Sequence, residues 1–167
     1  VSSIKNWKQS AAFEKALYKK NAELKVVGVA DAGKAFFSCM ISELLSSAGQ
    51  EKKILYIAHN DLAARKAYDD FNGLTGDAVL LEPYEYMIYD TYAKSTEIEF
   101  RRMESLRRII KGEFKILVVS VSAFIQYLVS PAHIRRSFLK ITSGMITEPQ
   151  DLADMLAAMD YDRVSKV

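Results

Sequence analysis

The chain has 167 residues, of which 50% are hydrophobic and 26% are charged, and its formal net charge is +2. This is the composition of an ordinary globular protein with a substantial core, and the near-neutral charge on its own predicts no strong electrostatic attraction to nucleic acid or to a membrane surface. The single cysteine, Cys39, excludes an intrachain disulfide, and we expect a cytoplasmic protein without a membrane span or a secretory signal.

The first predicted elements lead to a glycine-rich loop. Apolar residues at helical spacing predict a helix over Ile4–Lys20, and the short β-branched run Leu24–Gly28 predicts a buried strand. The sequence then reads Gly-Val-Ala-Asp-Ala-Gly-Lys-Ala from Gly28 to Ala35, and a second helical pattern follows. A strand, a Gly-x-x-x-x-Gly-Lys loop and a helix in this order predict a phosphate-binding loop.

The predicted nucleotide-binding positions of this loop are Gly28, Gly33, Lys34 and Ala35. In working loops, backbone N–H groups surround the phosphates, the lysine adds positive charge, and a Ser or Thr after the lysine holds Mg²⁺. Ala35 has no oxygen for the metal, so phosphoryl transfer would lose its main source of charge neutralisation. We therefore expect a vestigial loop, no catalytic residue, and no cofactor or metal. Two alternatives stay open: a tight turn with an exposed lysine, and an active ATPase or helicase domain, although no strand ends in Asp-Glu.

Strands and helices alternate through the middle of the chain. This alternation predicts an α/β fold like that of the P-loop NTPases, with a mainly parallel sheet and covering helices. On one helix, Glu97 and Arg101 are four residues apart, as are Glu104 and Arg108, and both pairs are expected to form ion pairs. The predicted elements are the strands Lys53–Ala58, Ala78–Leu81 and Lys115–Ser120 and the helices Asp61–Asn72, Ser95–Lys111 and Ala123–Val129, the last of them ended by Pro131.

Shorter elements of α+β character are expected at the end of the chain. We predict a first domain over residues 1–136 and the beginning of a second, truncated domain over 137–167. The missing initial Met and the strand-like end favour a piece of a longer protein. The predicted elements are a strand at Phe138–Thr142, a turn at Ser143–Gly144, a helix at Glu148–Met159 and a strand at Tyr161–Val167.

Three further groups of residues are weaker candidate sites. His59, His133 and Cys39 are too few and too scattered for a zinc site, so we expect core or loop positions. The basic residues could contact phosphates, but the glutamates among them favour a solvated, salt-bridged helix. A tyrosine cluster could stack on bases or be structurally buried. The basic residues are Arg101, Arg102, Arg107, Arg108, Lys111, Arg135 and Arg136, and the cluster is Tyr84, Tyr86, Tyr89 and Tyr92.

A series of motifs carries a resemblance to a known family. The motifs are Gly28–Lys34, Tyr56–Asp61 with Ala63 and Ala64, Glu82–Tyr84, Tyr89–Asp90, Arg101–Leu106 and Val118–Ala123. From about Leu24 to its last residue, the chain resembles the amino-terminal, UvrB-like module of the bacterial transcription-repair coupling factors, the Mfd family. UvrB has Thr after the loop lysine and a long aromatic hairpin that grips DNA, whereas this chain has Ala35 and the short segment Pro83–Ser95. These departures favour the coupling factors over a DNA-gripping UvrB fragment, which remains the third alternative.

The resemblance implies a role in transcription-coupled nucleotide excision repair. In this family the full-length protein recognises RNA polymerase stalled at a lesion and removes it from double-stranded DNA with a separate translocase that uses ATP and Mg²⁺. The UvrB-like module recruits the damage sensor UvrA and restrains the rest of the protein until polymerase is engaged. For this chain the resemblance implies a non-catalytic module that binds UvrA through the second domain. The principal UvrA contacts of the family lie further downstream, so no residue here receives that role.

Overall fold

The structure is a computed structural model, and it describes residues 10–19, 23–47, 49–50, 52–84, 96–136, 138–159, 161–162 and 164. The chain divides into two compact units, Val1–Gln126 and Tyr127–Val167. The predicted domain boundary at residue 136 lies further along the chain than the boundary between these two units, and it stays a prediction. No helix in the described part of the chain is long and apolar enough to cross a membrane.

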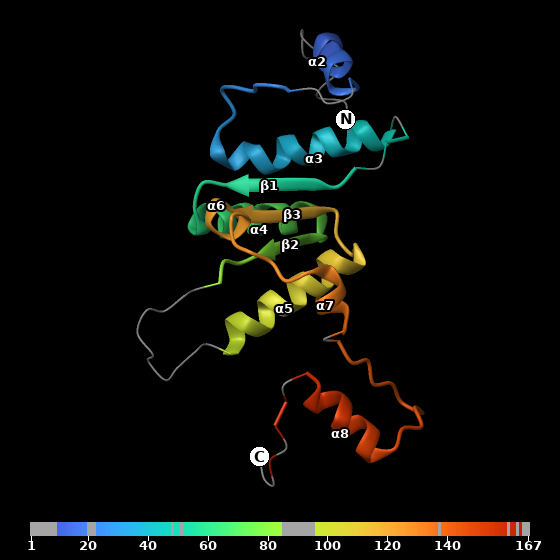
Figure 1. Cartoon of the computed structure of the whole chain (residues 1–167). Coiled ribbons are helices and arrows are strands. Elements are labelled where there is room, and N and C mark those ends of the chain that lie inside the picture. The colour runs from blue at the N-terminus through green and yellow to red at the C-terminus, as the bar shows by residue number, and fades with distance from the viewer. Residues whose placement is uncertain are drawn as a thin grey trace. The chain divides into compact units, whose positions relative to one another are not determined.

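The first unit contains a three-stranded parallel sheet, which Figure 1 shows with its helices. The strands are β1 (Ile54–Ala58), β2 (Ala78–Leu81) and β3 (Ile116–Ser120), and their order in the sheet is β1-β3-β2. β3 is central and runs parallel to both neighbours. These strands confirm the predicted α/β class and three of the predicted strand positions.

Helix α4 (Asp61–Thr75) covers one face of the sheet. It begins at Asn60, whose side chain accepts a hydrogen bond from the Ala63 N–H at 2.8 Å. It ends at Gly76, whose φ of 66° is in the left-handed region that glycine adopts at little cost. Both ends are therefore specified by local sequence. The core cluster that α4 shares with the sheet consists of Ala35, Ala58, Ala64, Ala67, Phe71, Ala78, Ile116 and Val118.

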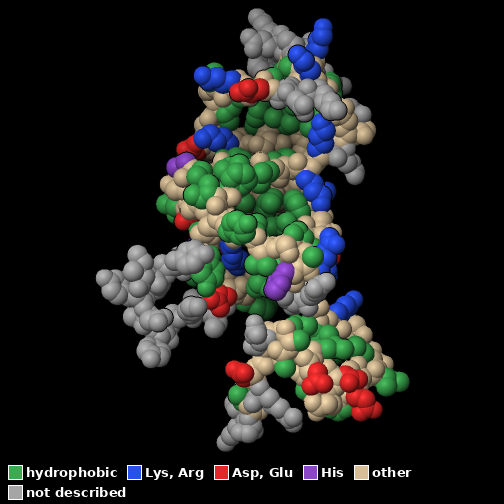
Figure 2. Space-filling view, in the orientation of Figure 1, with side chains coloured by type: hydrophobic (Ala, Val, Ile, Leu, Met, Phe, Trp, Pro, Cys, Tyr) green, Lys and Arg blue, Asp and Glu red, His purple; other side chains and the backbone are tan. Residues whose placement is uncertain are grey.

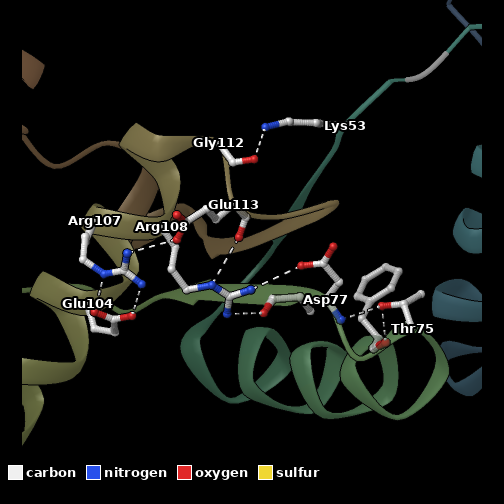
Figure 3. Close-up of polar contacts among 10 residues, drawn as sticks. Lys53, Thr75, Asp77, Glu104, Arg107, Arg108, Gly112 and Glu113 are labelled. Atoms are coloured by element: carbon white, nitrogen blue, oxygen red, sulfur yellow. Dashed lines mark hydrogen bonds and ion pairs between the residues drawn. The ribbon is translucent and has the colours of Figure 1, made fainter.

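Helix α5 (Thr96–Lys111) packs against β2 and is held there by arginines (Figure 3). Arg108 donates hydrogen bonds to the Ala78 carbonyl at 3.2 Å and to the Asp77 carboxylate at 3.3 Å. Arg107 forms two hydrogen bonds to Glu104, at 2.6 and 2.7 Å, and these lower the pKa of that carboxyl. The basic face of α5 is thus engaged in ion pairs and backbone contacts, as the interleaved glutamates predict.

One of the two predicted pairs on α5 is confirmed and one is wrong. Arg101 contacts Glu97 at 2.8 Å, as expected. Glu104 pairs with Arg107 rather than with Arg108, because Arg108 turns toward Asp77, directly before β2. Helical spacing permits both i+3 and i+4 partners, and only the tertiary contact decides between them.

The predicted strand Leu24–Gly28 is not a strand in the structure. Its side chains are exposed, and Val27 reaches 77% exposure. A strand requires a neighbour to satisfy its backbone groups, and no described strand lies beside this segment. The P-loop NTPase type of fold therefore remains a prediction. The helix before this segment, α2 (Ser10–Leu17), lies inside the predicted range 4–20, whose first residues and last residue are outside the described ones.

The predicted helix Ala123–Val129 is replaced by a shorter one and a later one. α6 (Val121–Phe124) ends early, and α7 (Pro131–Arg136) begins with the proline that was expected only to end a helix. Proline is favoured in the first turn because its missing N–H has no helical partner there. The second unit contains α7 and α8 (Pro149–Ala157).

The strands predicted for the second unit are not observed. Phe138–Thr142 is irregular, and so are the described residues of Tyr161–Val167, the rest of which lie outside the described part. Alternating sequence gives a strand only where a partner strand lies beside it. The turn at Ser143–Gly144 is confirmed, with Gly144 at a φ of 85°.

Candidate functional site

The glycine-lysine loop is the site that sequence singled out, and α3 (Asp31–Ser47) begins inside it. Gly28 has a positive φ of 81° and turns the chain into the loop. Gly33 already lies in the first turn of α3, where its N–H donates to the Ala30 carbonyl at 2.8 Å. Lys34 follows in the same turn, so the open part of the loop is confined to the few residues before Asp31.

Lys34 has a partner on its own helix. Its ammonium lies 2.6 Å from the Asp31 carboxylate, and both side chains are well exposed. The hydrogen bond from Lys34 lowers the pKa of Asp31, and the same contact raises the pKa of Lys34. A phosphate bound to Lys34 would either displace the Asp31 carboxylate or lie beside it. In the second case the two negative charges would repel each other.

Ala35 faces the core. It is only 3% exposed and belongs to the buried cluster with Ala58 and Ala64. A hydroxyl at this position would therefore enter packed apolar surroundings and not a solvated metal site. The position at which the sequence motif lacks a metal-binding oxygen is therefore one that packs in the core.

A cavity of about 250 Å³ lies beside Lys34, where β1 ends between α3 and α4. In parallel sheets this edge is where ligands usually bind. Its charges are mixed, because lysines and a histidine are accompanied by carboxylates. The polar residues that line it are Asp31, Lys34, Tyr56, His59, Lys66 and Asp70.

A hydrogen-bonded group that the sequence motifs did not single out joins the ends of β1 and β3. Ser122 donates to the Asp61 carboxylate at 2.6 Å, and its hydroxyl lies 2.9 Å from that of Ser120. Hydrogen bonds from Ser120 and Ser122 lower the pKa of Asp61, which makes this carboxylate a poor base for activating a serine. Ser120 also caps α6 through the Ala123 N–H. The group therefore stabilises the starts of α4 and α6. The sequence signal that could have revealed it was the presence of polar residues directly after buried strands.

The weaker candidate sites are scattered. His59 lines the cavity beside Lys34, whereas His133 lies in the second unit, and the thiol of Cys39 has a pKa raised by burial. Within the described residues, no group of His, Cys, Asp or Glu could hold a metal ion. Tyr84 is half-buried, and its backbone is held by the Gln126 side chain at 2.6 and 2.9 Å. Tyr86, Tyr89 and Tyr92 lie outside the described residues.

Comparison with known proteins gives one informative similarity. No family model matches the chain. The transcription-repair-coupling factor of Bacillus subtilis (strain 168) is 34% identical over 119 residues, which are 70% of this chain and 10% of that protein. The chain is thus distantly related to a coupling factor over most of its own length, and it spans about a tenth of the length of that relative.

Proposed function

We propose that this chain is a UvrB-like module of a transcription-repair coupling factor and acts as a binding module without catalytic activity. The similarity to a coupling factor over 119 residues carries the proposal. A part in transcription-coupled repair follows from that relation. The cytoplasm is the compartment in which such a protein would act.

The chemistry of the loop supports a role in binding rather than in hydrolysis. Ala35 is buried in the core, and Lys34 is paired with Asp31 at 2.6 Å. Neither residue is placed to neutralise the charge that develops on a transferred phosphoryl group. ATP and Mg²⁺ are, in this proposal, cofactors of a translocase located elsewhere in a longer coupling factor.

The proposed partner is UvrA, which the module would bring to a polymerase stalled at a lesion. RNA polymerase and double-stranded DNA would be contacted by other parts of the longer protein. α5 supports this division, because its arginines Arg101, Arg107 and Arg108 are occupied by carboxylates within 3.3 Å and offer little free charge to phosphates.

Steady-state ATP hydrolysis by the purified chain, with and without duplex DNA, separates this proposal from an active ATPase or helicase domain. We expect no turnover above background in either condition. Turnover that Lys34→Ala abolishes, while Lys66→Ala leaves it intact, would contradict the proposal. Lys66 is a matched control because it lines the same cavity but lies outside the loop.

A further inference from the structure

A second cavity, of about 760 Å³, lies at the end of the sheet where β1 and β3 begin, opposite the cavity beside Lys34. The last turns of α3 and α4 form its other walls. Most of the side chains that line it are exposed, so it is an open groove and not an enclosed pocket. Small ligands of parallel sheets usually bind at the other end of the strands. An open groove at this end is better suited to a segment of a partner protein.

Lysines dominate the charge of this cavity, which we call the lysine groove. Among the described residues that line it, Lys52, Lys53 and Lys115 stand against one carboxylate, that of Glu43. Lys52 and Lys115 are exposed, and neither has an ion pair within the described residues. Figure 2 shows Lys and Arg side chains along the side of the first unit where the strands begin. The groove therefore offers positive charge that is not already neutralised, unlike the paired arginines of α5.

The third lysine, Lys53, is held in place without being neutralised. Its ammonium group donates a hydrogen bond to the Gly112 carbonyl at 2.7 Å and lies 4.3 Å from the centre of the Phe114 ring. Neither of these partners carries a negative charge, although both attract a cation. Lys53 thus presents a positioned charge that still favours an anion nearby.

The groove also has an apolar part beside its lysines. Leu74 is 51% exposed there, and Phe114 and the buried Ile116 lie along the same cavity. An apolar centre with charged groups around it is the usual arrangement of a protein interface. The occupant should therefore bring both negative charge and an apolar side chain.

We propose that the lysine groove binds an acidic segment of a partner protein that carries an apolar side chain between its carboxylates. The carboxylates pair with Lys52 and Lys115, near the fixed charge of Lys53, and the apolar side chain contacts Leu74 and Phe114. A neutral or basic segment would bring no counter-charge to the lysines. This inference does not rest on the proposed function.

The position of Glu43 in the groove favours a peptide over nucleic acid. A nucleic acid carries a phosphate at every nucleotide, so one of its charges would lie beside the Glu43 carboxylate. A protein segment can place an uncharged residue at that point and keep its acidic residues beside the lysines. The exposed apolar side chain of Leu74 would likewise gain nothing from a phosphate.

Fluorescence anisotropy with a labelled peptide tests the proposal. The probe has one phenylalanine with aspartates and glutamates on both sides. One control peptide has Asn and Gln in place of the acids, and another has Ser in place of the phenylalanine. We expect saturable binding of the probe that weakens as salt is added, and weaker binding of both control peptides.

Charge reversal in the groove shows where the peptide binds. Lys52→Glu together with Lys115→Glu should weaken binding by more than about tenfold, because two attractions become repulsions. Lys19→Glu together with Lys25→Glu is the matched control, since it changes the net charge equally at exposed lysines outside the groove. This control should bind the probe like the native chain in about 0.1 M salt, where charges more than about 10 Å apart are screened.

Lys52→Gln together with Lys115→Gln keeps the test decisive if the reversed variant does not fold, and it should lose affinity in the same direction. A native chain that shows no saturable binding of the probe would overturn the proposal. Equal losses in the groove and control variants would also overturn it. Duplex DNA that binds more tightly than the probe, and is lost in the groove variant, would assign the groove to nucleic acid instead. A mass that rises with concentration only while the groove lysines are intact would assign it to a second copy.

Discussion

Replacing Ala35 by threonine restores the residue that a working phosphate-binding loop has after its lysine. This substitution tests whether position 35 serves to pack the core or has only lost a metal-binding hydroxyl. Ala35 is 3% exposed in the cluster that includes Ala58 and Ala64. Threonine adds a methyl and a hydroxyl group to this packed site. Overpacking of a core typically costs about 1–3 kcal/mol, and a buried hydroxyl without a good partner adds to that cost.

The expected change is large enough to measure by urea denaturation. With a denaturant slope of about 2 kcal/mol per molar urea, a loss of about 2 kcal/mol lowers the midpoint by about 1 M. Ala32→Thr is the matched control, because Ala32 lies on the same helix and is exposed. Its cost should be about 0.5 kcal/mol, the difference in helix propensity between the two residues. The packing account fails if Ala35→Thr is as stable as Ala32→Thr and the restored hydroxyl gives Mg²⁺-dependent ATP binding.

Three further predictions concern the ion pairs and hydrogen bonds of the first unit. Lys34→Ala should leave the free energy of unfolding unchanged, because the pair with Asp31 is exposed. Calorimetry with Mg²⁺ and ATP should show no difference in binding, and a sharp loss of micromolar affinity would refute a vestigial loop. The pKa of Asp61 is lowered in the folded state, so its stabilising effect is full above the ordinary value near 3.8 and is lost as the pH falls through the lower folded value. Ser122→Ala should reduce that acid sensitivity in urea titrations at several pH values, and an unchanged pH profile would show that the hydrogen bond has no such effect. Arg108→Ala should cost about 1–2 kcal/mol, since it leaves the Ala78 carbonyl without a donor, whereas a thermal scan that finds no loss would contradict a stabilising role for this contact between α5 and β2.

Local sequence specified the parts of the fold whose signals lie within one element. α4 was predicted over Asp61–Asn72 and extends to Thr75, and Asn60 and Gly76 mark its two ends. The strands β1, β2 and β3 are apolar runs bounded by polar residues, as buried parallel strands are. These elements carry their own boundaries, so a neighbour is not needed to recognise them.

The predictions that failed depended on a partner. Leu24–Gly28 has the composition of a strand but no described strand beside it, and its apolar side chains stay exposed. Glu104 had two possible helical partners, and the position of Asp77 at the start of β2 drew Arg108 away. Pairing of this kind is a tertiary property that spacing along one segment does not contain.

Only part of the candidate site was predicted, because its remaining contacts also depend on the tertiary structure. The letters from Gly28 to Ala35 identified the loop and the absence of a metal-binding oxygen, but not that α3 starts at Asp31. Asp31 is favourable in a first helical turn and pairs with Lys34, and together these contacts support the early start of the helix. The Asp61–Ser122 hydrogen bond joins residues 61 positions apart, so it required the fold.

UvrA capture by a chimeric coupling factor tests the central claim most directly. The segment of the Bacillus subtilis relative that aligns over 119 residues would be replaced by the corresponding segment of this chain, and a chimera carrying Lys34→Ala would serve as the control. We expect both chimeras to bind purified UvrA and to release stalled polymerase with ATP. The downstream part of the relative keeps its own UvrA contacts, so the measurement asks whether the segment of this chain supports them. A folded chimera that still releases polymerase but does not retain UvrA would contradict the assignment of this chain to a UvrA-recruiting module.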